Sequence, residues 1–126
     1  MPPEETTDQF APEPTVQETE WGGPWGAIDP VPNSVETLCV RIEPEVGKPR
    51  IYYYPYRTIG KWNWSMGAPE TLEIQIGGVH LTVSGTGLHR LAEALNSSQL
   101  RLIHFNHALL SGNICIRSIV FEDLTS

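Results

Sequence analysis

The first 36 residues of this 126-residue chain contain no lysine and no arginine. They hold eight of its 15 acidic residues and seven of its 11 prolines, so the formal net charge of −7 arises in this segment. Residues 37–126 carry the other seven acids and all eight bases, which leaves them close to neutral. This balance argues against a general nucleic-acid binder, because such a protein needs a dense basic face to displace counterions from phosphates.

Long apolar runs and cysteines are also scarce. No stretch approaches the roughly 20 apolar residues of a membrane-spanning helix, so we expect no membrane association. Cys39 and Cys115 are too far apart for a C-x-x-C metal or redox motif and too few for a disulfide framework. Both lie in apolar, strand-like patterns, which predicts buried, reduced thiols and a cytoplasmic protein. A disulfide between neighbouring strands stays open as an alternative.

The uneven charge and proline content predict two parts, an acidic Pro-rich tail over residues 1–36 and a single domain over residues 37–126. The first 20 residues lack any apolar period and cannot bury enough surface to offset their ordering entropy, so we predict that they are disordered. Trp21, Trp25 and Ile28 are unusual in a solvated tail. We expect this segment to pack on its own domain, and anchoring of a partner is the alternative.

Alternating apolar and polar residues predict several strands in the domain. The strongest signal is a pair of alternating runs, 72–76 and 79–84, on either side of Gly77-Gly78. This pattern predicts a hairpin, because glycine supplies the positive φ of a tight turn. We expect further strands at residues 37–43, 51–56, 58–64, 100–105 and 113–121. Pro55 cannot donate to a ladder and therefore indicates an edge strand or a strand end.

One amphipathic helix is predicted after the hairpin. Its apolar stripe has the spacing i, i+3, i+4 and i+7 and consists of Leu88, Leu91, Ala92 and Leu95. Thr86 is its expected N-cap. Since one helix can cover one face of a sheet, we expect an α+β domain with a mostly antiparallel sheet of about six strands and the helix packed on one face. A curled half-barrel closed by the helix is the alternative.

No catalytic or metal-binding pattern stands out. His104 and His107 would point to opposite faces of a strand and no third ligand can be named, so we expect no metal and no other cofactor. Ser84-Gly-Thr-Gly87 lies between a strand and a helix, where an anion could bind, but it matches neither G-x-G-x-x-G nor a Walker loop. We interpret its glycines as a sharp turn. Neither a nucleophile motif nor a pair of convergent carboxylates is evident, which does not favour an enzyme.

All four tyrosines and two of the four tryptophans lie within residues 52–64. In a strand, Tyr52, Tyr54 and Tyr56 share one face while Ile51 and Tyr53 share the other, so we expect one set in the core and one facing outward. An outward aromatic row beside basic residues is typical of interaction hot spots. Such a row could also stack on sugars or bases, or the helix or the Trp21–Trp25 segment could cover it. The predicted partner-binding residues are Tyr52, Tyr54, Tyr56, Arg57, Trp62 and Trp64.

The leading hypothesis is therefore a non-enzymatic interaction or scaffold domain that uses this aromatic strand for self-association or for binding a protein partner. The alternative is a small enzyme or ligand-binding protein with a pocket between sheet and helix, which would use His80, His104 or His107 as acid–base groups. In a third hypothesis the acidic tail folds back over the basic side chains of the domain by a salt-sensitive contact. Those side chains are Arg41, Arg50, Arg57 and Lys61.

Overall fold

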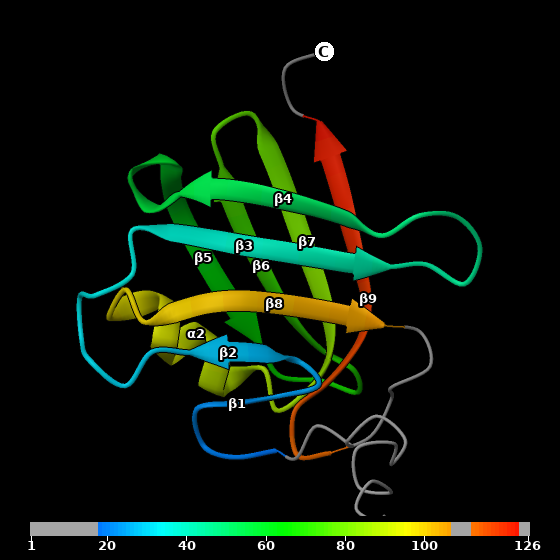
Figure 1. Ribbon diagram of the computed structural model, residues 1–126, viewed down its shortest axis with the longest axis horizontal. Helices are drawn as coiled ribbons and strands as arrows, with labels where there is room; N and C mark the ends of the chain where they lie inside the picture. The colour runs from blue at the N-terminus through cyan, green and yellow to red at the C-terminus, as the bar shows by residue number, and fades with distance from the viewer. Residues whose placement is uncertain (1–17, 107–111, 124–126) are drawn as a thin grey trace, which may run out of the picture.

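Two β-sheets face each other in the computed structural model, which describes residues 18–106 and 112–123 (Figure 1). One sheet has five strands in the order β1-β2-β8-β3-β4, and the other has four in the order β5-β6-β7-β9. The five-stranded sheet contains β1 (Gly22–Gly23), β2 (Gly26–Ile28), β3 (Thr37–Glu43), β4 (Arg50–Pro55) and β8 (Leu100–Asn106). The four-stranded sheet contains β5 (Ile59–Ser65), β6 (Glu70–Ile76), β7 (Val79–Thr86) and β9 (Cys115–Asp123). Pairing is antiparallel except between β3 and β8.

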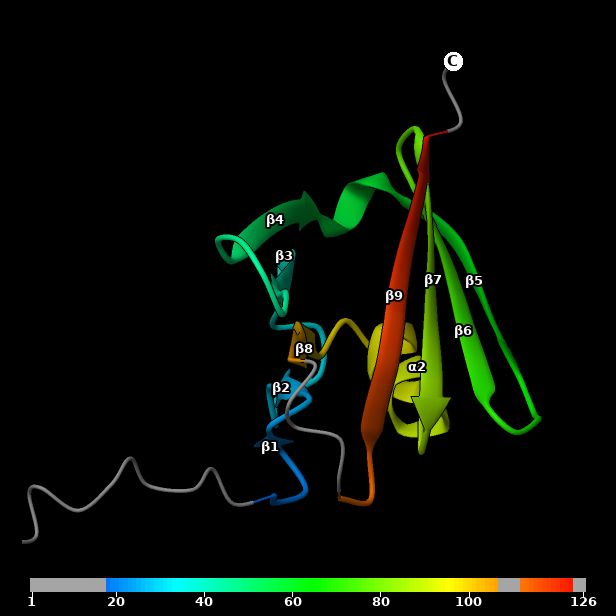
Figure 2. The same cartoon turned by 90° about the vertical axis from the view of Figure 1, so that its right-hand side faces the viewer.

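The core lies between the two sheets. Alternate residues of each central strand point inward, as the pleat requires, and are almost fully removed from water. Examples are Leu38 and Val40 of β3, and Leu72 and Ile74 of β6. Figure 2 shows the sheets from the side, with α2 (His89–Asn96) at one end of the space between them. The helix contacts β5 of one sheet and β8 of the other.

The strongest local predictions are confirmed. β6 and β7 form the hairpin around Gly77-Gly78, and Gly77 has a φ of +56°, as a tight turn requires. The predicted amphipathic helix is α2, which buries Leu91 and Leu95. The α+β class with mostly antiparallel strands also agrees with the structure.

The prediction of one sheet with about six strands is wrong, because the described residues form nine strands in two sheets that do not close into a barrel. The break predicted at Pro55 is the physical reason. A short 3₁₀ turn, Tyr56–Thr58, follows this proline and carries the chain from the end of one sheet to the start of the other. The helix therefore does not cover one face of a single sheet, as predicted, but lies between the two sheets and contacts a strand of each (Figure 2).

The segment around Trp25 belongs to the folded domain. β2 pairs with β8, and Trp25 is buried with only 2% of its surface exposed. Gly26 allows this close approach, because a Cβ at its position would overlap the carbonyl oxygen of Leu102. The packed part of the chain thus includes Gly22–Ile28, upstream of the boundary that composition suggests at residue 37. Residues 1–17, which carry most of the predicted disorder, lie outside the described residues.

Thr86 does not cap α2, contrary to prediction. No side chain of the preceding turn caps the helix, and a carboxylate from β6 takes this role. Glu70 accepts hydrogen bonds from the backbone N–H groups of Gly87 at 3.0 Å and Leu88 at 2.9 Å. The turn after Ser84 therefore holds an anion supplied by the chain itself.

Candidate functional site

β4 is an edge strand of the five-stranded sheet. It pairs with β3 on one side, and no other described strand pairs with it on the other. Figure 1 shows it at the upper limit of this sheet, with its direction opposite to that of β3. Because an unpaired strand edge presents free backbone donors and acceptors, β4 can pair with a strand of another chain and is a candidate interaction surface.

The two faces of β4 differ in exposure. Tyr52 and Tyr54 point into the molecule and pack partly against the core. Tyr53 and Ile51 point outward, with 67% and 44% of their surfaces exposed. The alternation that the sequence predicts is therefore present, and the outward set is Ile51 and Tyr53.

The backbone of β4 is oriented by its pairing with β3. The N–H of Tyr56 donates to the carbonyl oxygen of Glu36 at 2.8 Å, just beyond the end of the strand. Hydrogen-bonded pairs alternate along an antiparallel ladder, so Tyr54 and Tyr52 also direct their backbone groups toward β3. The N–H and C=O groups of Ile51 and Tyr53 consequently point away from β3, outward from the edge of the sheet. Pro55 has the same orientation, but it has no N–H to donate.

The outer face beside β4 carries an apolar row. The row begins beside Tyr53 and runs across successive strands, with Cys39 on β3, Leu102 on β8 and Ala27 on β2. Cys39 was expected to be buried but is half-buried on this face, and its desolvation raises the pKa of its thiol. Cys115 is buried in the other sheet, and both thiols are free. The row gives the outer face of four strands an apolar stripe that ends at the β4 edge.

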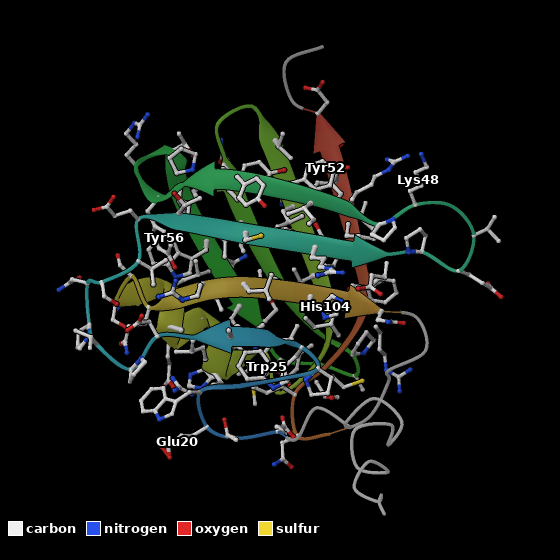
Figure 3. The ribbon with its side chains drawn as sticks, in the orientation of Figure 1. Glu20, Trp25, Lys48, Tyr52, Tyr56 and His104 are labelled. Carbon is white, nitrogen blue, oxygen red and sulfur yellow. The ribbon has the colours of Figure 1, made fainter. Side chains whose placement is uncertain are left out.

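The aromatic residues predicted to bind a partner are mostly half-buried and contact one another or the core. Tyr52 stacks on Tyr54 with ring centroids 6.3 Å apart and meets Phe121 at 4.7 Å. The hydroxyl of Tyr56 donates to the carbonyl oxygen of Leu100 at 2.6 Å, and burial raises the pKa of Tyr56 to about 12. Figure 3 labels Tyr52 on β4 and Tyr56 in the 3₁₀ turn that follows this strand.

The two tryptophans of the predicted surface lie on β5 and face α2. The indole N–H of Trp64 donates to Glu70 Oε1 at 2.9 Å, and its ring meets the His89 ring edge-on at 4.8 Å. Trp62 is half-buried in the same region, whereas Arg57 is exposed in the 3₁₀ turn. The structure therefore divides the predicted set between two places, and it adds Ile51 and Tyr53, which sequence reasoning left out of the site. Their alternation with Tyr52 was the available signal.

The histidines of the enzyme alternative do not share a site. His80 contacts Glu73 at 3.3 Å on the outer face of the four-stranded sheet. His104, which Figure 3 labels on β8, contacts Glu43 at 3.1 Å on the outer face of the five-stranded sheet. Arg41 also binds Glu43 there. Neither histidine lines the groove of about 520 Å³ between β5 and α2. His107 lies outside the described residues, within which no cluster of metal-binding side chains is found.

Comparisons with models of known protein families, with curated proteins and with solved structures find no match to this chain. Within the described residues, no helix has the length and apolar character needed to cross a membrane.

Proposed function

We propose that this chain is a non-enzymatic self-association module in which β4 of one copy pairs with β4 of a second copy. One observation carries the proposal: Ile51 and Tyr53 of the edge strand expose both their side chains and their unpaired backbone groups. An antiparallel pair of such edges would join two five-stranded sheets into one continuous sheet. β-strand addition of this kind is a recurrent mode of protein association.

The positions of two prolines support one register. Pro49 and Pro55 flank the strand at equal separations from Tyr52, three residues on either side. A twofold axis at Tyr52 sets Ile51 opposite Tyr53 of the second copy and pairs the two prolines with each other. Each of the two Ile51–Tyr53 pairs exchanges two backbone hydrogen bonds. Pro49 and Pro55 occupy the next hydrogen-bonding positions of this ladder but have no N–H to donate, so the pairing is limited to the central residues.

Side-chain chemistry favours the same register. An aromatic residue directly opposite a β-branched one is a stabilising cross-strand pair, worth about 0.2–1 kcal/mol. Arg50 falls opposite Tyr54 of the second copy, so the two Arg50 guanidinium groups do not face each other. Such an interface is small, and we expect a reversible dimer whose population rises with protein concentration.

The test compares two charge insertions by sedimentation velocity. Tyr53→Glu places a carboxylate in the centre of the proposed interface. The matched control, Val120→Glu, changes a residue of similar exposure (56%) on β9, an edge strand of the other sheet. We expect wild type and Val120→Glu to dimerise and Tyr53→Glu to remain monomeric.

A second variant examines the backbone directly. Tyr53→Pro removes an N–H that does not serve the β3–β4 ladder, so the fold is retained while two of the four intersubunit hydrogen bonds are lost. Circular dichroism checks that each variant is folded. A wild type that stays monomeric at every accessible concentration, or equal dissociation by both glutamate variants, would contradict the proposal.

A further inference from the structure

A groove opens at the end of the molecule where the β3–β4 loop passes the end of β9. Its volume is about 490 Å³, within the range of small-molecule sites. The floor is apolar and includes Ile42, Tyr52 and Phe121, and Val46 lies on the loop beside it. The lining also includes two basic side chains, Lys48 and Arg50. We name this feature the open-end groove.

We propose that the open-end groove binds a small amphipathic anion, a carboxylate joined to an apolar chain or ring. The apolar part would lie on Ile42, Tyr52 and Phe121, and the carboxylate would meet Lys48 and Arg50. This inference does not require β4 pairing, because Tyr52 and Arg50 turn their side chains to the inner side of the strand, whereas Ile51 and Tyr53, which would form the backbone hydrogen bonds between copies, turn theirs to the outer side.

The charge of the lining selects the sign of the ligand. Among residues 18–106 and 112–123, no acidic side chain lines the open-end groove, although Glu45 lies on the same loop. Neither Lys48 nor Arg50 forms an ion pair with a described residue. By contrast, the groove beside His80 contains Glu73, and the groove beside His89 contains Glu93. Two cations that form no ion pair within the described residues, beside an apolar floor, favour a carboxylate, which both can bind by charge-assisted hydrogen bonds.

The floor of the groove is already assembled in the structure. The ring of Tyr52 is held between Tyr54 and Phe121, which come from different sheets. Figure 3 shows Tyr52 on β4 and Lys48 on the adjoining β3–β4 loop. An apolar ligand would therefore meet a formed surface and would not have to order one, which lowers the entropic cost of binding.

The test titrates the full chain with dodecanoate, below the concentration at which it forms micelles, and follows amide chemical shifts by NMR. Dodecanol serves as the uncharged probe. We expect dodecanoate to shift the amides of residues 42–52 and 121, and dodecanol to bind at least about tenfold more weakly because it lacks the charge. Equal binding of the two probes, or no binding of dodecanoate, overturns the proposal.

Two double variants test the cations. Lys48→Gln/Arg50→Gln removes the positive charges of the groove, and the control Arg57→Gln/Lys61→Gln removes the same charge outside it. We expect about tenfold weaker dodecanoate binding only in the first, and equal weakening in both overturns the proposal. Tyr53→Glu should bind dodecanoate normally, which separates this test from that of dimerisation.

A last variant examines the acidic N-terminal segment as a competing occupant. It replaces Glu4, Glu5, Asp8 and Glu13 with Gln or Asn in the full chain. If dodecanoate binds only to this variant, the groove is occupied by the chain's own acidic segment and the proposal is wrong. Unchanged binding supports an external anion.

Discussion

The carboxylate of Glu70 accepts the indole N–H of Trp64 at 2.9 Å and thereby ties β6 to the neighbouring β5. The same carboxylate receives the backbone N–H groups of Gly87 and Leu88 at the start of α2. The Trp64 hydrogen bond is the largest cause of the lowered pKa of Glu70, and the backbone hydrogen bonds lower it further. One acidic side chain thus connects a strand pair with the only α-helix of the described residues.

We expect Glu70→Gln to lower the free energy of unfolding by about 1–2 kcal/mol, the usual cost of losing a helix cap. An amide keeps one acceptor oxygen but cannot receive all of these donors with a negative charge. Urea unfolding measures the difference. Glu73→Gln on the same strand is the control, since its partly exposed contact with His80 contributes little. A loss of equal size in both variants would argue against the capping role.

The same carboxylate predicts a pH dependence. Because the pKa of Glu70 lies below its ordinary value of 4.5 in the folded state, the ionised form favours folding. This contribution is fully present above the ordinary pKa and is lost as the pH falls through the lowered folded pKa. We therefore expect the stability difference between wild type and Glu70→Gln to shrink as the pH drops below about 4.5. Urea unfolding at a series of pH values measures it, and a constant difference would contradict the assignment.

Tyr56 provides a prediction at the alkaline end. Its hydroxyl donates to the carbonyl oxygen of Leu100, and burial raises its pKa to about 12. We expect Tyr56→Phe to cost about 1–2 kcal/mol, because the buried carbonyl loses its donor. Tyr53→Phe, at an exposed position, should cost close to nothing. Thermal or urea unfolding near neutral pH compares the two variants.

Ionisation of Tyr56 can also be followed directly. The folded state favours the neutral phenol, so the stability it contributes is present below the ordinary pKa of 10 and falls as the pH rises toward 12. Ultraviolet titration of phenolate in wild type and Tyr56→Phe should differ by one group that ionises last. If the tyrosine that is lost in Tyr56→Phe ionises near pH 10 in the wild type, this account is contradicted.

The sequence predicts local elements of this protein better than their assembly. The Gly77-Gly78 hairpin and the stripe containing Leu91 and Leu95 depend on neighbouring residues, so both can be read from spacing. The division into two sheets depends on distant pairings instead, above all on β8, which inserts between β2 and β3. Trp25 lies in an acidic, Pro-rich stretch whose composition suggests a tail, although its side chain packs in the core.

The candidate site shows the same limit. Alternation predicts that Tyr52 and Tyr53 lie on opposite faces of a strand, but it does not say which face is buried. That choice is made by Phe121, far along the chain on β9, which packs against Tyr52 and leaves Tyr53 exposed. Glu70 is likewise an ordinary polar residue in the sequence, and only the fold brings it to the start of α2.

The burial of Trp25 provides the last prediction, which concerns where the domain begins. Trp25→Ala removes a side chain that is 2% exposed in the core, so we expect a loss of about 3–5 kcal/mol in the free energy of unfolding. Trp21→Ala is the control, because Trp21 is 37% exposed and its ring lies beside Arg90, whose guanidinium is 5.5 Å from the ring centroid. That contact at an exposed site is worth about 0.5–1 kcal/mol. Unfolding in guanidinium chloride compares the two variants. Similar small losses in the free energy of unfolding would mean that the segment Gly22–Ile28 is dispensable for the domain.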